Sequence, residues 1–336
     1  MNVKIIAEAG VNHDGDFSKA IELIDIASAS GADFVKFQSF TASQLVTKTT
    51  EKAGYQNSSV PHVDTQYSLL KELELSRTQM EALAEHAGQR NIGFISAPFD
   101  IPNIDFLCDL GVPFLKIPSG EITNVPYMRH IAQTGKPLVM STGMAYLHEV
   151  IEAAETLFGA GLQKENLTVL HCNTEYPSPM DDVNLRAMIT IKNELGVSVG
   201  YSDHTLGIEV SLAAVALGAT VIEKHFTLDP SSDGPDHKAS LSPQELAQLV
   251  QSIRNIESAL GSTVKAPSNS EKKNIDVVRK KIVAAMKIKK GDRFSKENIT
   301  TKRSNNGASA TFWDHVLGQE ALRDYDVNES IEYVEK

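Results

Sequence analysis

The chain has 336 residues, 41% of them apolar and 22% charged, which is typical of a globular protein with one large domain and one small one. A formal net charge of −11 without a concentrated basic stretch argues against nucleic-acid binding, and no apolar run approaches membrane-spanning length. Cys108 and Cys172 have no zinc-ligand spacing and predict no disulfide framework, and the chain enters a strand pattern at residue 3 without a signal-peptide core. We therefore expect a cytoplasmic protein without a membrane or nucleic-acid partner.

Short β-rich runs alternate with amphipathic helical patterns from residue 3 to about residue 260. The predicted strands are 3–7, 33–38, 93–96, 113–117, 137–141, 167–171, 197–202 and 219–224. The predicted helices are 17–30, 77–90, 103–110, 125–133, 147–158, 183–195, 208–217 and 243–260. Eight βα units predict a TIM (β/α)8 barrel. The alternative, a doubly wound open sheet, is disfavoured because no Gly-rich dinucleotide fingerprint follows the first strand.

Two segments break this rhythm. Residues 41–66 are polar and lack a clear period, and a loop of this length in a compact domain favours a functional flap. After the barrel, predicted for 1–262, a Gly-, Pro- and Ser-containing linker at 263–275 leads to 276–336, where strands and turns return. We predict a small β-rich domain there, too small to be robust without packing against something else.

Two histidines follow neighbouring predicted strands. His204 lies in Gly-Tyr-Ser-Asp-His-Thr at 200–205, and His225 lies in Glu-Lys-His-Phe-Thr at 223–227. Either one alone is better explained as an ordinary hydrogen-bonded residue. Parallel strands of a barrel end at one face, however, so the two imidazoles can share a divalent metal there, and the pair favours a metal site.

The other strand ends bring further polar residues to the same mouth. Lys36 and Lys116 stand in apolar strands, where a charge is costly unless it is paired, and two buried cations suggest an anionic ligand. Hydroxyls that suit a phosphate follow later strands, at Ser119, Ser141 and Ser202. Structural explanations stay open: the lysines can pair with Glu8 or Glu223, Glu121 can cap a helix, and Cys172 can be a spectator thiol.

Several motifs occur together in one order along nearly the whole chain. They are Ala-Glu-Ala-Gly-Val-Asn-His at 7–13, Val-Lys-Phe-Gln at 35–38, Lys-Ile-Pro-Ser-Gly-Glu at 116–121, Ser-Thr-Gly-Met at 141–144, His-Cys-Asn-Thr-Glu-Tyr-Pro at 171–177, Tyr-Ser-Asp-His at 201–204, Glu-Lys-His-Phe-Thr at 223–227 and Gly-Pro-Asp-His at 234–237. The chain thereby resembles the sialic acid synthases, including N-acetylneuraminate synthase and N,N'-diacetyllegionaminic acid synthase. Residues 288–291 and 301–303 resemble the antifreeze-like (SAF) domain of that family.

The resemblance implies condensation of phosphoenolpyruvate and water with an N-acetylated mannose-type sugar, either N-acetylmannosamine or 2,4-diacetamido-2,4,6-trideoxymannose. The products would be phosphate, released by C–O cleavage, and a nine-carbon 2-keto acid (N-acetylneuraminate or legionaminate) of the kind used in surface polysaccharides. His204 and His225 match ligands of a divalent metal, usually Mn²⁺, with Mg²⁺ or Co²⁺ as alternatives. That metal would polarise the aldehyde.

The resemblance also assigns roles to the mouth residues. Glu8 and Glu121 match the catalytic carboxylates. The substrate contacts are Lys36 and Lys116 for the carboxylate; Ser119, Ser141, Ser202 and either Asn173 or Thr174 for the phosphate; and Gln38, Tyr176, Asp236 and Arg303 for the sugar. The domain carrying Arg303 would reach the partner's barrel in a domain-swapped homodimer.

Two alternatives stay open. One is pseudaminic acid synthase, which uses a differently configured diacetamido sugar; the motifs at 118–121 and 173–176 favour the sialic and legionaminic branch instead. The other is a non-catalytic barrel that binds a sugar phosphate. Three departures from the family pattern bear on the sugar and phosphate sites: Ala97 in place of a threonine, the order Asn173-Thr174, and the sequence Ser-Asn-Asn at 304–306.

Overall fold

A computed structural model describes residues 2–52, 60 and 63–333. Its contacts divide the chain into two compact units, Met1–Gly261 and Ser262–Lys336. Within the described residues, no helix has both the length and the apolar character needed to cross a membrane. Each unit has a hydrophobic core of its own.

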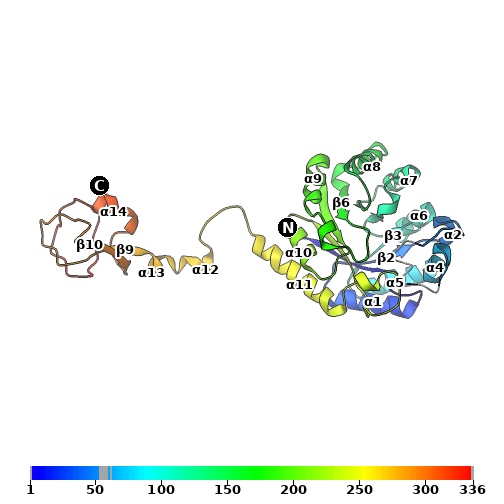
Figure 1. Cartoon of the computed structure of the whole chain (residues 1–336), viewed down its shortest axis with the longest axis horizontal. Helices are drawn as coiled ribbons and strands as arrows, with labels where there is room; N and C mark the ends of the chain where they lie inside the picture. Colours follow the sequence, from blue (N-terminus) through cyan, green and yellow to red (C-terminus); the bar gives the residue numbers. More distant parts are fainter. Residues whose placement is uncertain (1, 53–59, 61–62, 334–336) are drawn as a thin grey trace. The chain divides into compact units, whose positions relative to one another are not determined.

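The first unit is built on eight parallel strands enclosed by helices (Figure 1). The strands are β1 (Lys4–Gly10), β2 (Phe34–Ser39), β3 (Gly93–Pro98), β4 (Leu115–Ile117), β5 (Leu138–Ser141), β6 (Leu167–Cys172), β7 (Ser198–Asp203) and β8 (Val221–His225). Hydrogen bonds join them in the order β3-β2-β1-β8-β7-β6-β5-β4, and β3 and β4, at the two ends of this order, also contact each other. The sheet therefore curves round on itself, which confirms the predicted TIM barrel.

The helices of this unit cover the outer face of the sheet. They are α1 (Phe17–Ala29), α2 (Ala42–Leu45), α4 (Gln66–Leu73), α5 (Arg77–Gln89), α6 (Ile101–Asp109), α7 (Val125–Gln133), α8 (Leu147–Gly159), α9 (Arg186–Leu195), α10 (Glu209–Ala216) and α11 (Pro243–Leu260), with short 3₁₀ turns η1 (Ser119–Glu121), η2 (Lys164–Asn166), η3 (Met180–Asp182) and η4 (His237–Ala239). Local sequence fixes several starts: Asp16 caps α1, and Ser76 and Ser242 form capping boxes with Gln79 and Glu245.

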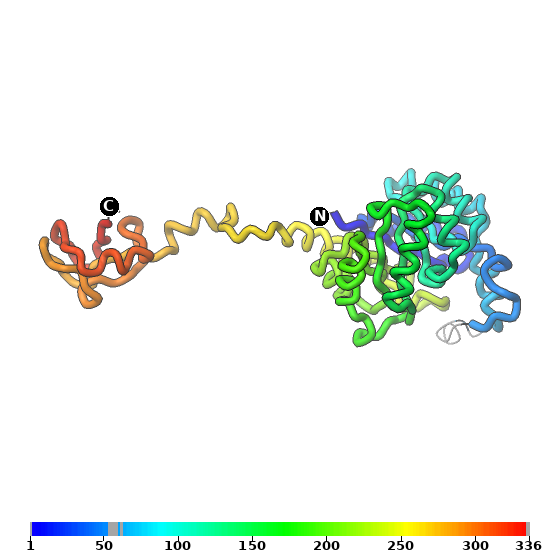
Figure 2. Tube along the Cα trace, turned by 90° about the horizontal axis from the view of Figure 1, so that it is seen from above, coloured from blue at the N-terminus to red at the C-terminus, as the bar shows by residue number. Residues whose placement is uncertain are grey.

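The segment 41–66 differs from its prediction as a loop without secondary structure. Its described part contains α2, and α4 begins at Gln66; residues 53–59 and 61–62 lie outside the described residues. Helices α2 and α4 pack together at the edge of the barrel (Figures 1 and 2). A four-residue helix such as α2 is too short to show a period in the sequence, and its fold depends on this tertiary contact.

Side chains inside the barrel lie in layers, because alternate residues of each strand point inward. Ile6, Ile95, Val139, Leu170 and Val221 form an apolar layer together with Phe114. Two residues further along the same strands come Glu8, Ala97, Ser141, Cys172 and Glu223, which line a cavity at the carboxyl ends. A polar layer of side chains therefore lies directly next to the apolar layer, on the side of the carboxyl ends of the strands.

The second unit contains α12 (Asn269–Lys272), α13 (Ile275–Val278), β9 (Lys280–Ala284), β10 (Ile299–Arg303), η5 (Ala310–Phe312) and α14 (Trp313–Val316). Strands β9 and β10 pair antiparallel, and ten buried residues, among them Ile282, Phe294 and Ile331, form the core of this unit. The small β-rich fold predicted from the sequence is thus present. The predicted linker 263–275 is not uniformly irregular, since it holds α12 and the first residue of α13.

Candidate active site

One cavity of about 520 Å³ opens at the carboxyl ends of the barrel strands. It gathers thirteen of the fifteen residues predicted for the site: Glu8, Lys36, Gln38, Lys116, Ser119, Glu121, Ser141, Thr174, Tyr176, Ser202, His204, His225 and Asp236. Asn173 does not line it, and Arg303 belongs to the second unit. The alternation of the strands explains the gathering of those that lie in strands, such as Glu8, Lys36 and Ser202, because they follow the inward-facing positions of the layer below; the others lie in the connections after the strands.

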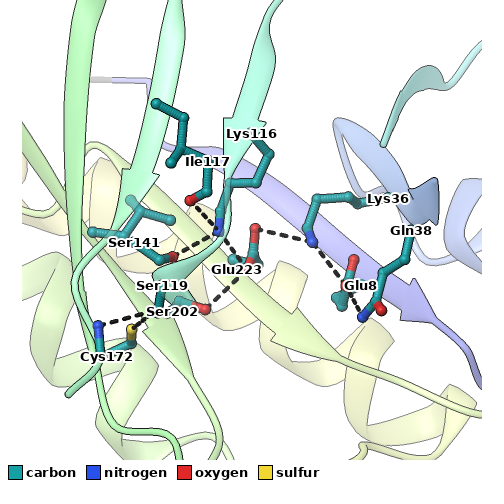
Figure 3. A network of polar contacts seen from close by, with 12 residues as sticks. Glu8, Lys36, Gln38, Lys116, Ile117, Ser119, Ser141, Cys172, Ser202 and Glu223 are labelled. Carbon is teal, nitrogen blue, oxygen red and sulfur yellow. Dashed lines mark hydrogen bonds and ion pairs between the residues drawn. The ribbon is translucent and has the colours of Figure 1, made fainter. Parts of the chain in front are cut away.

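Two buried lysines share one carboxylate at the base of the cavity (Figure 3). Lys36 Nζ lies 2.7 Å from Glu8 Oε1 and 3.7 Å from Glu223 Oε2, and Lys116 Nζ lies 3.6 Å from Glu223 Oε1. The lysines therefore do pair with acids, as the structural explanation required. These ion pairs leave two acceptor atoms unused, however, because Oε2 of Glu8 and Oε2 of Glu223 are buried without a hydrogen-bond partner among the described residues.

The pKa values of these groups follow from burial and from each other. Burial raises the pKa of Glu8 to about 7 despite the attraction of Lys36. Burial also lowers the pKa of Lys116, against the attraction of Glu223. For Lys36 and Glu223 the facing charges outweigh burial, so the pKa of Lys36 is raised and that of Glu223 is lowered. Glu8 is therefore partly protonated near neutral pH, which leaves part of the charge of Lys36 available to an anion.

Hydroxyl groups surround Lys116. Lys116 Nζ donates to Ser141 Oγ at 2.6 Å, and Ser202 Oγ donates to Glu223 Oε1 at 2.9 Å. Ser119 Oγ accepts from the backbone N–H of Gly143 at 2.9 Å and lies 3.4 Å from Cys172 Sγ. These groups come from η1, β5, β6 and β7, so they form one polar arc on that side of the mouth.

Glu121 lies at the end of η1, and burial raises its pKa. Its Oε2 accepts from Asn124 Nδ2 at 2.6 Å, and Asn124 caps α7 through Tyr127 N–H. The carboxylate therefore supports the start of α7 and also lines the cavity. The structural and the catalytic explanation of Glu121 are compatible.

His204 and His225 lie at the ends of β7 and β8 with ring centroids 5.4 Å apart. The Nδ1–H of His204 donates to the carbonyl of Asn173, which leaves Nε2 as an acceptor 3.1 Å from the hydroxyl of Tyr176. His225 Nδ1 is buried without a hydrogen-bond partner among the described residues and lies 3.8 Å from Asp236 Oδ2.

The two histidines fit a divalent metal by the chemistry of their donors. Burial lowers the pKa of His204 to about 4 and that of His225 well below its ordinary value, so both are in the neutral form that binds metal. In the described part of the chain no three candidate ligands come together at metal-binding distance. The candidate ligands are therefore the two histidines, with Asp236 Oδ2 3.8 Å from His225 Nδ1.

Adjacent residues at strand ends have separate tasks. Asp203 and Lys224 face outward, where they form a buried ion pair of 3.1 Å and Asp203 accepts from Ser211. Asn173 is a turn residue: its Oδ1 accepts from Glu175 N–H and Ser178 Oγ. Of the Asn173–Thr174 pair, only Thr174 lines the cavity.

Sequence reasoning misses two parts of this site. It treats Glu223 only as a structural partner, although its spacing of two from His225 places both on the inward face of β8. The second part is an apolar side of the cavity formed by residues of α2 and α4, for which the sequence of a four-residue helix offers no periodic signal.

A parallel barrel with a lysine-and-hydroxyl anion site beside a histidine pair defines a class of enzymes that act on a small anionic substrate. The comparisons identify the family within that class. The NeuB family model matches residues 23–265 and the SAF domain model matches 279–326. The chain belongs to the NeuB family and carries a SAF domain, which confirms the predicted resemblance.

Several relatives cover nearly the whole chain. It is 52% identical to an N,N'-diacetyllegionaminic acid synthase of Campylobacter jejuni (97% of this chain, 98% of that one) and 50% identical to one of Legionella pneumophila (95% and 90%). A pseudaminic acid synthase of Campylobacter jejuni is 32% identical over 98% of this chain and 95% of that one. The crystal structure of an N-acetylneuraminic acid synthetase of Leptospira borgpetersenii, in complex with citrate, is 34% identical with a TM-score of 0.71 over 82% of this chain and 91% of that chain.

Proposed function

We propose that this chain condenses phosphoenolpyruvate, water and 2,4-diacetamido-2,4,6-trideoxymannose to N,N'-diacetyllegionaminic acid and phosphate. The observation that carries the proposal is the pair of buried lysines beside a hydroxyl arc and two neutral histidines in one cavity. The greater identity to the two legionaminic acid synthases than to the pseudaminic acid synthase supports this sugar. The two free cysteines fit the reducing cytoplasm in which we place the reaction.

We propose separate roles for the lysines and the hydroxyls in binding phosphoenolpyruvate. Lys36 and Lys116 hold the phosphoenolpyruvate carboxylate, and the hydroxyls of Ser119, Ser141 and Ser202 hold its phosphate. This places C3 of the enol beside the histidines, where the aldehyde carbon of the sugar lies and the new C–C bond forms. Water then adds to C2, and the C2–O bond to phosphate breaks.

The histidines would hold the metal that the family implies, which we propose to be Mn²⁺. When bound, it supplies Lewis-acid polarisation of the aldehyde oxygen. Glu8, with a pKa of about 7, and Glu121, with a raised pKa, are placed to orient water and move its protons. Thr174, Gln38, Tyr176 and Asp236 line the same cavity and complete the contacts to phosphate and sugar.

The test of the reaction is phosphate release from phosphoenolpyruvate with Mn²⁺ and each candidate sugar, with the product identified by mass spectrometry. We expect release only when all three components are present, and the diacetamido sugar to be the best substrate. A non-catalytic binding barrel would instead bind ligand after metal removal and release no phosphate with any sugar.

Binding of phosphoenolpyruvate should take up a proton at pH 8. Free Glu8, with its pKa of about 7, is mostly ionised at that pH. A bound anion shares the charge of Lys36 and raises the pKa of Glu8 further, so the carboxylate protonates. The ligand's phosphate is already fully ionised and contributes little, since phosphate monoesters lose their second proton near pH 6. The binding enthalpy of the metal-free chain should therefore vary with the ionisation enthalpy of the buffer, and this variation should vanish in Glu8→Gln. A buffer-independent enthalpy in the wild type would contradict it.

Arg303 should matter for the sugar and act from a second subunit. It is exposed at the end of β10, and we propose that the chain forms a domain-swapped homodimer in which this side chain completes the partner's cavity. Arg303→Ala should raise the KM for the sugar about tenfold or more and leave the KM for phosphoenolpyruvate within about twofold.

Subunit mixing tests the swap. Arg303→Ala and His225→Ala chains, each weakly active alone, should recover about a quarter of wild-type activity after exchange at equal amounts. Half of the dimers are then mixed, and each mixed dimer has one intact site. No recovery despite demonstrated exchange would exclude the swapped arrangement.

A further inference from the structure

The cavity has two unlike sides, and only one of them is explained by phosphoenolpyruvate. The hydroxyls of Ser119, Ser141 and Ser202 come from η1, β5 and β7, and the histidines lie at the ends of β7 and β8. The segments after β2 and β3 supply the other side, which is mostly apolar: Phe40, Leu45, Val46, Leu69, Leu70, Leu73 and Phe99 line the cavity there, together with one polar side chain, Gln66, at the start of α4. An anion gains nothing from such a surface, so this side serves another part of the bound substrates.

The half-buried apolar side chains on this side are Leu45 and Val46, at the end of α2, Leu70 in α4, and Phe99 after β3. We call the first three the apolar wall. Each is half-buried, so part of each side chain remains accessible to a ligand. Behind the wall lies a buried cluster that includes Val11, Phe40, Leu69 and Leu73. Because α2 and α4 are packed on this cluster, the wall presents a fixed apolar surface.

The position of the wall determines which end of the sugar it meets. The aldehyde carbon must lie where the enol C3 and the histidine pair meet, on the β7–β8 side of the cavity. The far end of the sugar, from C4 to C6, then extends toward the side formed after β2 and β3. A hydroxyl at C6 placed there loses water and finds no partner in a leucine or valine side chain, whereas a methyl at C6 and the methyl of a C4 acetamido group gain apolar contact.

We propose that Leu45, Val46 and Leu70 determine specificity by selecting a sugar with apolar groups at its distal carbons, a 6-deoxy-4-acylamido sugar, over one with hydroxyls there. This inference rests on the proposed function, whose sugar it explains by named residues. It assigns the choice of substrate to these three side chains of α2 and α4 and not to the histidines or lysines.

The test is the ratio of kcat/KM for 2,4-diacetamido-2,4,6-trideoxymannose to that for N-acetylmannosamine. Val46→Thr replaces one methyl by a hydroxyl at nearly constant shape, and Leu70→Gln puts an amide in the wall with a residue that helices tolerate. Each should lower the ratio about tenfold, and the double variant further, mainly by weakening use of the deoxy sugar. Leu217→Gln is the matched control: Leu217 is 42% exposed on the surface at the end of α10, outside this cavity, and its ratio should stay as in the wild type.

Two further measurements separate this inference from the proposed function. Calorimetry of the Mn²⁺-loaded chain gives the affinity for each of the two sugars, and their ratio reports the preference without turnover. Absence of phosphate release would overturn the proposed reaction, whereas the role of the apolar wall would still be tested by this ratio of affinities. Thermal melting confirms that each variant is folded. If Val46→Thr and Leu70→Gln are folded and both keep the wild-type preference within about twofold in turnover and in binding, the wall does not select the sugar.

Discussion

Replacing His225 by alanine should lower turnover by about a thousandfold or more, because we propose that both histidines hold the metal that would polarise the aldehyde. The affinity for phosphoenolpyruvate should change by less than about tenfold, since the anion is held by the lysines and hydroxyls on the other side of the cavity. His204→Ala should behave in the same way. The measurements are steady-state kinetics, calorimetry of phosphoenolpyruvate binding, and metal content after gel filtration.

His171 provides the matched control. It also lies in a barrel strand, but its Nε2 bonds to the carbonyl of Val183 and it does not line the cavity. His171→Ala should cost stability and leave bound metal and turnover within about threefold of the wild type. Full activity and full metal content in His225→Ala would refute the metal site.

The second large effect is expected for Lys36→Met, which leaves Glu8 in the barrel without its closest cation and Glu223 paired with Lys116 alone. Removing one partner of a buried ion pair typically costs about 3–5 kcal/mol, and we expect a loss near this range at pH 8. The sign of the pH dependence follows from Glu8, whose pKa is raised to about 7 by burial and rises further without Lys36. Protonation of Glu8 neutralises the unpaired carboxylate, so the loss of stability should be smaller at pH 6 than at pH 8. At pH 8 the double variant Lys36→Met/Glu8→Gln should recover at least half of the stability that Lys36→Met loses.

Lys224→Met separates stability from catalysis. Lys224 is as buried as Lys36 and pairs with Asp203 at 3.1 Å, but it points out of the barrel. Urea unfolding should show a comparable loss for both variants. Only Lys36→Met should lower kcat/KM for phosphoenolpyruvate by about a thousandfold. Equal kinetic effects in the two variants would argue that Lys36 acts through stability alone.

The barrel and most of the cavity were predictable because one rule governs both. The same alternation that makes Ile6 part of the apolar layer makes Glu8 part of the polar one, and parallel strands bring all such ends to one face. Collecting the residues at the ends of the predicted strands was therefore enough to find twelve of the predicted site residues that line the cavity, and the family resemblance added Asp236. The roles of these residues stay predictions until the variants are measured.

The parts that escaped prediction depend on contacts that no local pattern encodes. The sharing of Glu223 by two lysines requires β2, β4 and β8 to meet across the barrel. The apolar wall requires α2 and α4 to pack on a cluster drawn from residues 11 to 99, and α2 alone is too short to be recognised. Which of Asn173 and Thr174 faces the cavity is decided by a turn closed by Ser178 and Glu175.

The alternation along β7 and β8 also constrains how such an enzyme can diversify. Ser202 and His204 line the cavity, whereas Asp203 and Lys224, one position away, form an ion pair on the outer face. Inserting or deleting a single residue in either strand would exchange the two faces, so that side chains that now line the cavity would point away from it. Insertions and deletions keep this alternation only when they fall in the connections between strands and helices. The connection after β2 is the one that carries the apolar wall. Under our proposal, a change in the length of that connection would alter which sugar is accepted and would leave the residues proposed for the reaction in place.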